Sequence, residues 1–256
     1  MPNLLLRPLL CGLAALLLTG LPARAGEVRV ELGPQLTNST ALDIALRDHA
    51  FTTLAENITQ VFDLPRDLVL RVADCGDANS FYEAENATIL VCGELLPEFA
   101  AMAADMEPDP DLALNLVYDN LLFTVYHELG HALVDMLTLP ITGREEDVAD
   151  QVAVWLMLMT LDEGEGMQAT LDAADFFYAP PQDGDRLDFW DSHGLDIQRY
   201  HNIVCWAYGY DPDQAAAAFG EHLDEALPPD RRQSCADEFA QMDKSYRTLL
   251  DKVLRK

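Results

Sequence analysis

The stretch that decides the fold is residues 112–138, LALNLVYDNLLFTVYHELGHALVDMLT. Its apolar residues recur at intervals of three and four, which predicts one long, largely buried helix. Near its middle, residues 127–131 read HELGH, so His127 and His131 are four residues apart. Side chains at positions i and i+4 lie on one face of a helix, about one turn apart. The stretch therefore predicts a helix that presents two imidazoles side by side.

Two imidazoles at this spacing are typical of a zinc site. Neutral histidines bind Zn²⁺ through a ring nitrogen at about 2.0–2.1 Å, and the HExxH spacing directs both rings toward one ion. Glu128 then lies beside the metal, where its carboxylate can take a proton from water and deliver it to a leaving amine. The sequence predicts one Zn²⁺ with Glu128 as a catalytic residue. The alternative is two helix histidines that bind no metal.

A catalytic zinc usually has three protein ligands, so a third must come from elsewhere. The metzincin continuation of HExxH is excluded, because Val134 and Leu137 stand where it needs glycine and histidine. Pro140 ends the first helix, and residues 142–145, TGRE, resemble a capping box that opens a second helix over about 143–162. A short connection of this kind would place the second helix against the paired histidines.

The second predicted helix begins with the acidic string 145–150, EEDVAD. Glu146 and Asp150 are four apart and share a face, so we expect Glu146 to be the third zinc ligand and Asp150 to accept the outer N–H of a liganding histidine. Glu145 is expected to bind no metal, so zinc should remain in a Glu145→Ala variant. The alternative is that Glu145, Glu146 and Asp147 are only the favourable anions of a helix N-terminus.

A donor to the developing oxyanion would complete a hydrolytic site. The candidates are His193, Tyr200, His201, Tyr208 and Tyr210. We prefer His193, because it ends an irregular segment over 179–194 and precedes a predicted helix, where a side chain can reach over a cleft. The alternative is a loop histidine without a role.

The rest of the chain predicts an α+β fold. Strands are expected over about 27–31, 67–72 and 87–92, and a helix over about 40–62. A modest helix is expected over 95–104, and helices dominate later, over about 195–208, 213–226 and 230–254. The fold should combine a small N-terminal sheet, an active-site helix pair and a helical C-terminal part.

Composition and the N-terminal segment limit the classes of protein to which this chain can belong. The chain has 256 residues, 44 of them acidic and 16 basic, with a formal net charge of −28, which excludes nucleic acid as a partner. Residues 1–25 have a basic start, an apolar run and Ala23-Arg24-Ala25, the pattern of a secretory signal peptide. We expect residues 26–256 to form a single exported domain, periplasmic or secreted, without stable membrane insertion.

Cysteine usage agrees with export. Four cysteines remain after residue 25, namely Cys75, Cys92, Cys205 and Cys235, and they allow three pairings. We expect Cys75–Cys92 and Cys205–Cys235, since each pair brackets one supersecondary unit. The alternative is four buried free thiols.

Two motifs together resemble a known class. HELGH followed by E-x-x-A-D on the next helix is similar to the gluzincin class of zinc metallopeptidases, which includes minigluzincins. HELGHAL, GREEDVADQ, FWDSHGL…QRYHN and CWAYG…DP further resemble an exported bacterial "putative metallopeptidase" family of otherwise unknown function, over most of residues 65–251. The resemblance implies a gluzincin-like fold, with Glu146 as the zinc ligand and Asp150 orienting a histidine.

The expected function is zinc-dependent hydrolysis of peptide bonds in a peptide or protein substrate. Two rivals stay open: a zinc-binding scaffold or inactive homologue, and an exported acidic binding module in which HELGH is accidental. The sequence does not give the substrate or the oligomeric state.

Overall fold

The computed structural model describes residues 25–34, 36–47, 49–178 and 189–255. The predicted signal peptide, except Ala25, and most of the irregular segment 179–194 lie outside the described residues. No helix of the described part is long and apolar enough to cross a membrane.

The sheet has four strands in the order β1-β2-β4-β3. β1, β2 and β4 are parallel, and β3 pairs antiparallel to β4 at one edge. The bounds are β1 Val28–Leu32, β2 Leu68–Ala73, β3 Ser80–Glu83 and β4 Thr88–Cys92. β2 and β4 are rich in β-branched and leucine side chains that are buried, and they form the centre of the sheet.

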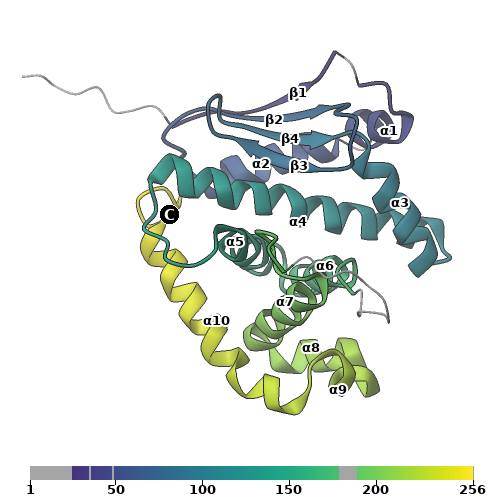
Figure 1. Ribbon diagram of the computed structural model, residues 1–256, viewed down its shortest axis with the longest axis vertical. Helices are drawn as coiled ribbons and strands as arrows, with labels where there is room; N and C mark the ends of the chain where they lie inside the picture. Colours follow the sequence, from purple (N-terminus) through teal and green to yellow (C-terminus); the bar gives the residue numbers. More distant parts are fainter. Residues whose placement is uncertain (1–24, 35, 48, 179–188, 256) are drawn as a thin grey trace, which may run out of the picture.

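Helices form the rest of the described fold, which is of the α+β class as predicted (Figure 1). Their bounds are α1 Ser39–Arg47, α2 Ala50–Val61, α3 Leu95–Met106, α4 Pro110–Leu137, α5 Glu145–Thr160, α6 Glu163–Asp175, α7 Asp196–Tyr210, α8 Pro212–Phe219, α9 Leu223–Ala226 and α10 Pro229–Leu249. α4 lies between the sheet and the other long helices, so one helix contacts both halves of the core (Figure 1).

The long helix α4 has a defined start and end. Asp109 caps it by accepting from the backbone N–H groups of Asp111 and Leu112, and Pro110 occupies the first turn, where a missing N–H costs nothing. Thr138 ends it in the left-handed region, with φ of 50°. Fourteen of its residues are buried, which is expected for a helix covered on both sides.

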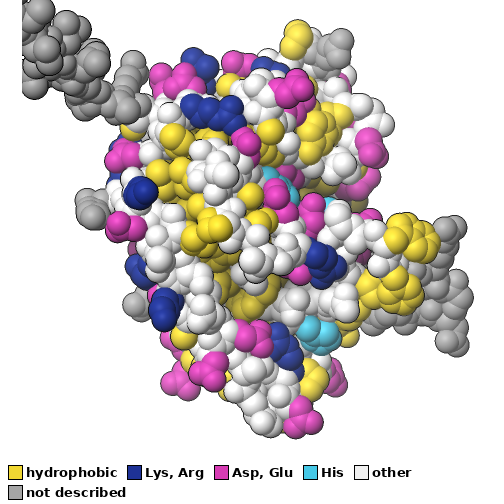
Figure 2. Space-filling view, turned by 60° about the vertical axis from the view of Figure 1, so that its left-hand side comes forward, with side chains coloured by type: hydrophobic (Ala, Val, Ile, Leu, Met, Phe, Trp, Pro, Cys, Tyr) yellow, Lys and Arg dark blue, Asp and Glu magenta, His cyan; other side chains and the backbone are white. Residues whose placement is uncertain are grey.

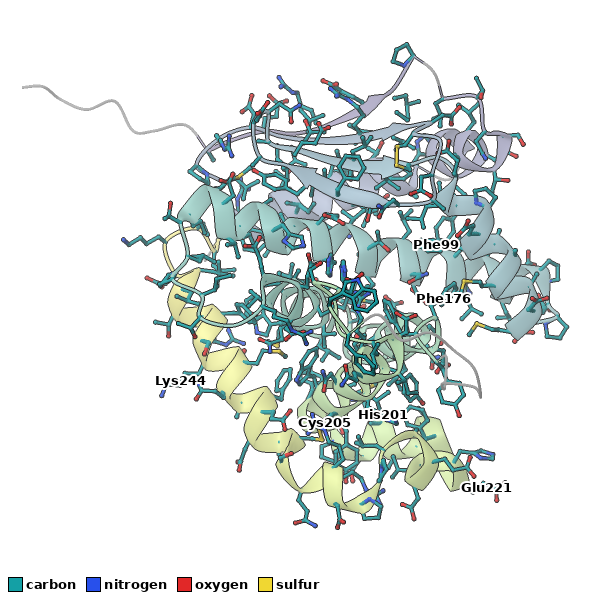
Figure 3. All side chains as sticks on the ribbon, in the orientation of Figure 1. Phe99, Phe176, His201, Cys205, Glu221 and Lys244 are labelled. Atoms are coloured by element: carbon teal, nitrogen blue, oxygen red, sulfur yellow. A yellow bond between two sulfur atoms is a disulfide. The ribbon has the colours of Figure 1, made fainter. Side chains whose placement is uncertain are left out.

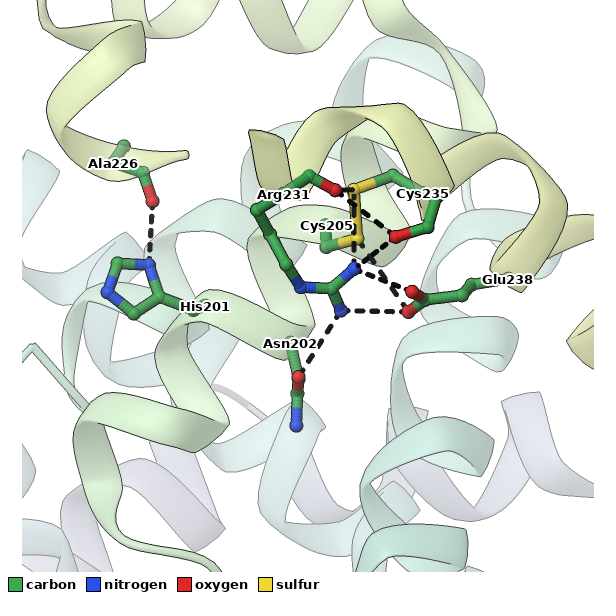
Figure 4. The surroundings of a disulfide bond; sticks show 8 residues. His201, Asn202, Cys205, Ala226, Arg231, Cys235 and Glu238 are labelled. Carbon is green, nitrogen blue, oxygen red and sulfur yellow. Dashed lines mark hydrogen bonds and ion pairs between the residues drawn. A yellow bond between two sulfur atoms is a disulfide. The ribbon is translucent and has the colours of Figure 1, made fainter. Parts of the chain in front are cut away.

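The C-terminal part is fastened by the bridge between Cys205 of α7 and Cys235 of α10, with an S–S distance of 2.04 Å (Figure 4). Beside it, Arg231 forms an ion pair with Glu238. The helices approach closely because Gly209 lacks a side chain: a Cβ there would lie 2.1 Å from the carbonyl oxygen of Cys235. Cys75 and Cys92 are likewise paired, at 2.05 Å, so both expected pairings are found at disulfide distance.

Aromatic contacts tie the other helices together. Phe99 of α3 and Phe176, which follows α6, meet edge to face with ring centroids 5.7 Å apart (Figure 3). Trp155 of α5 donates to Asp243 of α10 at 2.9 Å. The first contact joins α3 to the end of α6, and the second joins α5 to α10.

Four local expectations need correction. The helix expected over 213–226 breaks into α8 and α9, because Gly220 between them has φ of 54°. The helix expected over 40–62 is two helices, because the chain turns between them and His49 has φ of 55°. Ser80–Glu83 is a strand that was not predicted. α6 was not expected, since Gly164 and Gly166 weaken the helical pattern of its first turn.

Candidate metal centre

The centre is built where α4 packs on α5. Gly130 allows the contact, because a Cβ at that position would lie 2.8 Å from Cα of Ala149. The glycine inside HELGH therefore brings the first two turns of α5 against the histidine face of α4. The close approach of Gly130 and Ala149 places Glu146 opposite His127 and His131.

Three donor atoms converge at this contact. Nε2 of His127 and Nε2 of His131 are 3.3 Å apart, and Oε2 of Glu146 lies 3.3 Å from the first and 3.2 Å from the second. Ligands about 2.0–2.1 Å from a tetrahedral Zn²⁺ lie about 3.3–3.4 Å from one another. The three atoms are thus spaced like three corners of a zinc coordination tetrahedron.

Carboxylates of α5 hold the other nitrogen of each imidazole. Nδ1 of His127 lies 2.8 Å from Oδ1 of Asp150, and Nδ1 of His131 lies 2.9 Å from Oε1 of Glu145. A carboxylate accepts, so each Nδ1 donates, and in the neutral ring the lone pair for a metal then lies on Nε2. Asp150 contacts His127, and its role beside a zinc ligand stays a prediction; the contact of Glu145 with His131 was not expected.

Arg199 of α7 was missed by sequence reasoning. Its Nε donates to Oδ2 of Asp150 at 2.9 Å and its Nη2 to Oδ1 at 2.7 Å, a bidentate pair in which the side chains are 14% and 7% exposed. Its guanidinium also lies 4.1 Å from the ring centroid of Phe177. A lone arginine within a helix carries no sequence signal of this contact, since the two partners are 49 residues apart.

His193 lies at the same centre. Its Nε2 is 2.9 Å from Oε2 of Glu146, and Asp191 holds its Nδ1 at 3.2 Å. His127, Glu146 and His193 form a group whose ligand atoms all lie within 4.8 Å of one another, a group that could hold a metal ion. His201, one of the other oxyanion candidates, instead bonds the carbonyl of Ala226, away from this group (Figure 4).

The pKa values follow from these contacts. Burial opposes protonation of His127, but hydrogen bonds to Asp150 and Glu146 outweigh it and raise its pKa to about 9. Hydrogen bonds to His127, His131 and His193 lower the pKa of Glu146 far below its usual value. Burial would raise the pKa of Asp150, but His127 and Arg199 lower it to about 2. The carboxylates of Glu146 and Asp150 are therefore anionic at neutral pH.

The centre lies in a cavity of about 830 Å³. One wall is the edge strand β3, and α4, Phe177 and His193 contribute to the others. Figure 2 shows histidine side chains recessed among acidic side chains near the middle of this face. Glu128 is 4% exposed and lines the same cavity. The cavity thus combines a strand edge, a candidate metal group and a buried carboxylate.

The described residues thus form an α+β fold around a histidine–carboxylate group that could hold a metal ion. A family described as "Putative metallopeptidase" (DUF4344) matches residues 34–250, and the chain belongs to this family. No curated protein and no solved structure matches the chain. The family expected from the sequence is thereby confirmed, while the gluzincin assignment stays a prediction.

Proposed function

We propose that the protein is an exported zinc-dependent metallopeptidase that hydrolyses peptide bonds. The observation that carries this proposal is the 3.2–3.3 Å spacing of Nε2 of His127, Nε2 of His131 and Oε2 of Glu146. Two nitrogens and one carboxylate oxygen are a donor set that suits zinc and leaves one position open for catalysis. Two disulfide pairs and the N-terminal signal pattern support export.

Each residue of the chain has a distinct task in this proposal. A bound Zn²⁺ would supply a Lewis acid that polarises the scissile carbonyl and lowers the pKa of a water molecule. Glu128 removes the proton from the attacking water and passes it to the leaving amine. His193, held by Asp191, donates to the developing oxyanion. Asp150 and Glu145 keep the two imidazoles in the tautomer and orientation that bind metal.

The position of the edge strand β3 favours a peptide as the substrate. It pairs with β4 on one side, and its other side borders the cavity that contains His127 and Glu128. An extended peptide can add to such an edge through main-chain hydrogen bonds, which recognise the backbone of many sequences. A substrate bound in this way would run past the proposed zinc site with a peptide bond next to Glu128.

A zinc-binding scaffold without catalysis is the second candidate, and the position of His193 favours it. If its Nε2 were a fourth ligand, the metal would have four protein donors, as structural zinc sites do. The two candidates differ in what His193→Ala changes. Loss of an oxyanion donor lowers kcat and leaves zinc affinity unchanged, whereas loss of a ligand weakens zinc affinity.

One panel of variants tests the proposal. Wild type and Glu128→Gln should each bind one equivalent of zinc, and Glu128→Gln should lose about 10²–10⁴-fold in kcat on a peptide library. His131→Ala should lose both zinc and activity, and Glu98→Gln, an exposed acid-to-amide change on α3, should lose neither. Equal turnover by wild type and Glu128→Gln would exclude this site as the source of activity. Stoichiometric zinc with no hydrolysis by wild type would favour the scaffold.

A further inference from the structure

Two side chains of β3 point at α4. Ser80 and Tyr82 are two residues apart and so share a face of the strand, while Glu128 and Asp135 are seven apart and share a face of the helix. Oγ of Ser80 donates to Oε1 of Glu128 at 2.8 Å, and the hydroxyl of Tyr82 donates to Oδ2 of Asp135 at 2.8 Å. The strand is therefore fastened to α4 at two points, and the first is the carboxylate assigned to proton transfer.

The bond from Ser80 restricts one oxygen of a mobile group. A glutamate has three side-chain torsions, and the last one is broad, so an unheld carboxylate samples many orientations. An ionised carboxylate only accepts hydrogen bonds, so the Ser80 hydroxyl must donate, and it occupies Oε1. Oε2 is then the oxygen that remains for a proton from water. Because Glu128 is 4% exposed, bulk water competes little with the serine for this bond.

We propose that Ser80 is a positioning residue that aims the carboxylate of Glu128, an inference that rests on the proposed peptidase function. The same strand would carry the extended substrate, so the bond from Ser80 fixes the proton acceptor relative to the strand that aligns the scissile peptide. Proton transfer is sensitive to such geometry, since a misplacement of about 1 Å can cost about 10²-fold in rate. Ser80 touches neither substrate nor metal in this scheme and acts through Glu128.

Tyr82 provides a matched comparison. Tyr82→Phe removes the second hydrogen bond between the same strand and the same helix, together with the bond that Arg66 donates to the same hydroxyl, and leaves the bond from Ser80 to Glu128 in place. If the bonds only hold β3 against α4, Ser80→Ala and Tyr82→Phe should have similar effects. If Ser80 positions Glu128, Ser80→Ala should lower kcat much more than Tyr82→Phe does.

The experiment measures kcat, KM and zinc content of the full chain after signal removal. Ser80→Ala should bind zinc at full stoichiometry and lose about 10- to 100-fold in kcat with little change in KM. Ser80→Thr keeps the hydroxyl, so its kcat should stay much closer to wild type than the kcat of Ser80→Ala. In the Glu128→Gln background, Ser80→Ala should cost nothing further. Equal kcat in wild type and Ser80→Ala, or equal losses in Ser80→Ala and Tyr82→Phe, would overturn the inference.

A second measurement needs no activity. In metal-free protein, Ser80→Ala should lower the urea midpoint of unfolding in the wild-type background and leave it unchanged in a Glu128→Ala background, because the bond is then already absent. Additive shifts would show that the two residues are not coupled and would overturn the inference. If wild type hydrolyses no peptide, the proposed function fails while this coupling still decides whether Ser80 holds Glu128.

Discussion

Each half of α4 packs against a cluster of acidic side chains, and the pKa values of the two clusters are shifted in opposite directions. Near the C-terminal half, Glu146 and Asp150 face histidines and Arg199, and their pKa values are lowered. Near the N-terminal half, Asp119 hydrogen-bonds to Asp172 of α6, and burial together with this neighbour raises the pKa of Asp119 to about 8. The cavities beside them are of similar size, about 830 and 840 Å³.

This difference shows that neither the volume of a cavity nor the presence of acidic side chains is enough to identify the metal centre. At the N-terminal cluster, carboxyl groups face one another, so the pair retains a proton instead of attracting a cation. At the C-terminal cluster, imidazoles and an arginine face the carboxylates, and each carboxylate accepts defined hydrogen bonds from them. What distinguishes the centre is that Asp150 and Glu145 each hold the outer nitrogen of one imidazole, which turns both inner nitrogens toward Glu146.

The largest expected effect concerns the charge that balances Asp150. Arg199→Met keeps apolar contact with Phe177 but leaves a buried carboxylate without its bidentate partner. Breaking a buried pair by removing one member costs about 3–5 kcal/mol, and we expect a loss of that size in the free energy of unfolding. The measurement is urea denaturation of the metal-free protein.

Arg144 supplies the control for Arg199. It makes a comparable bidentate contact with Asp147, but the two side chains are 52% and 40% exposed. Exposed pairs contribute about 0–1 kcal/mol, so Arg144→Met should change stability by no more than that. Similar losses of unfolding free energy in Arg199→Met and Arg144→Met would show that burial of the carboxylate does not determine the size of the effect.

The next effect concerns the carboxylates that hold the imidazoles. Asp150→Asn and Glu145→Gln should each weaken zinc affinity by about 10–100-fold, because each removes a charged acceptor of a ligand N–H. This revises the expectation that changing Glu145 leaves zinc unaffected. Asp172→Asn, in the other cluster, should leave affinity unchanged. Competition with a chelator measures all three, and unchanged affinity in Glu145→Gln would restrict the orienting role to Asp150.

Local periodicity made much of this centre predictable. The i, i+4 spacings of His127 with His131 and of Glu146 with Asp150 follow from helix geometry alone, and Pro140 marked the turn between the helices. The expected α+β class and both cysteine pairs also follow from local patterns. These features depend on residues close in sequence, where propensity and period carry the information.

Contacts between distant segments could not be read in this way. Ser80 meets Glu128 across 48 residues, and Arg199 meets Asp150 across 49. The strand that carries Ser80 has only four residues, too few to show alternation. Gly166, which weakens the helical pattern of α6, allows that helix to approach the carbonyl of Met157, where a Cβ would lie at 2.6 Å. Tertiary packing decided each of these cases.

The smallest expected effect is a change in how stability depends on pH at the N-terminal cluster. The pKa of Asp119 is about 8 in the folded protein, against 3.8 for an unperturbed aspartate, with burial and the hydrogen bond to Asp172 as the main causes. A raised pKa means that the folded state binds the proton more tightly, so this stabilisation is complete below the unfolded pKa and is lost as pH rises toward 8. Asp119→Asn keeps a donor for Asp172 and removes the titration. Because the pair is partly open to solvent, we expect a gain of about 1 kcal/mol at pH 8 and none at pH 4. Thermal unfolding of wild type, Asp119→Asn and the exposed control Asp105→Asn at these two pH values measures it. An equal gain at both pH values would mean that Asp119 does not share a proton with Asp172.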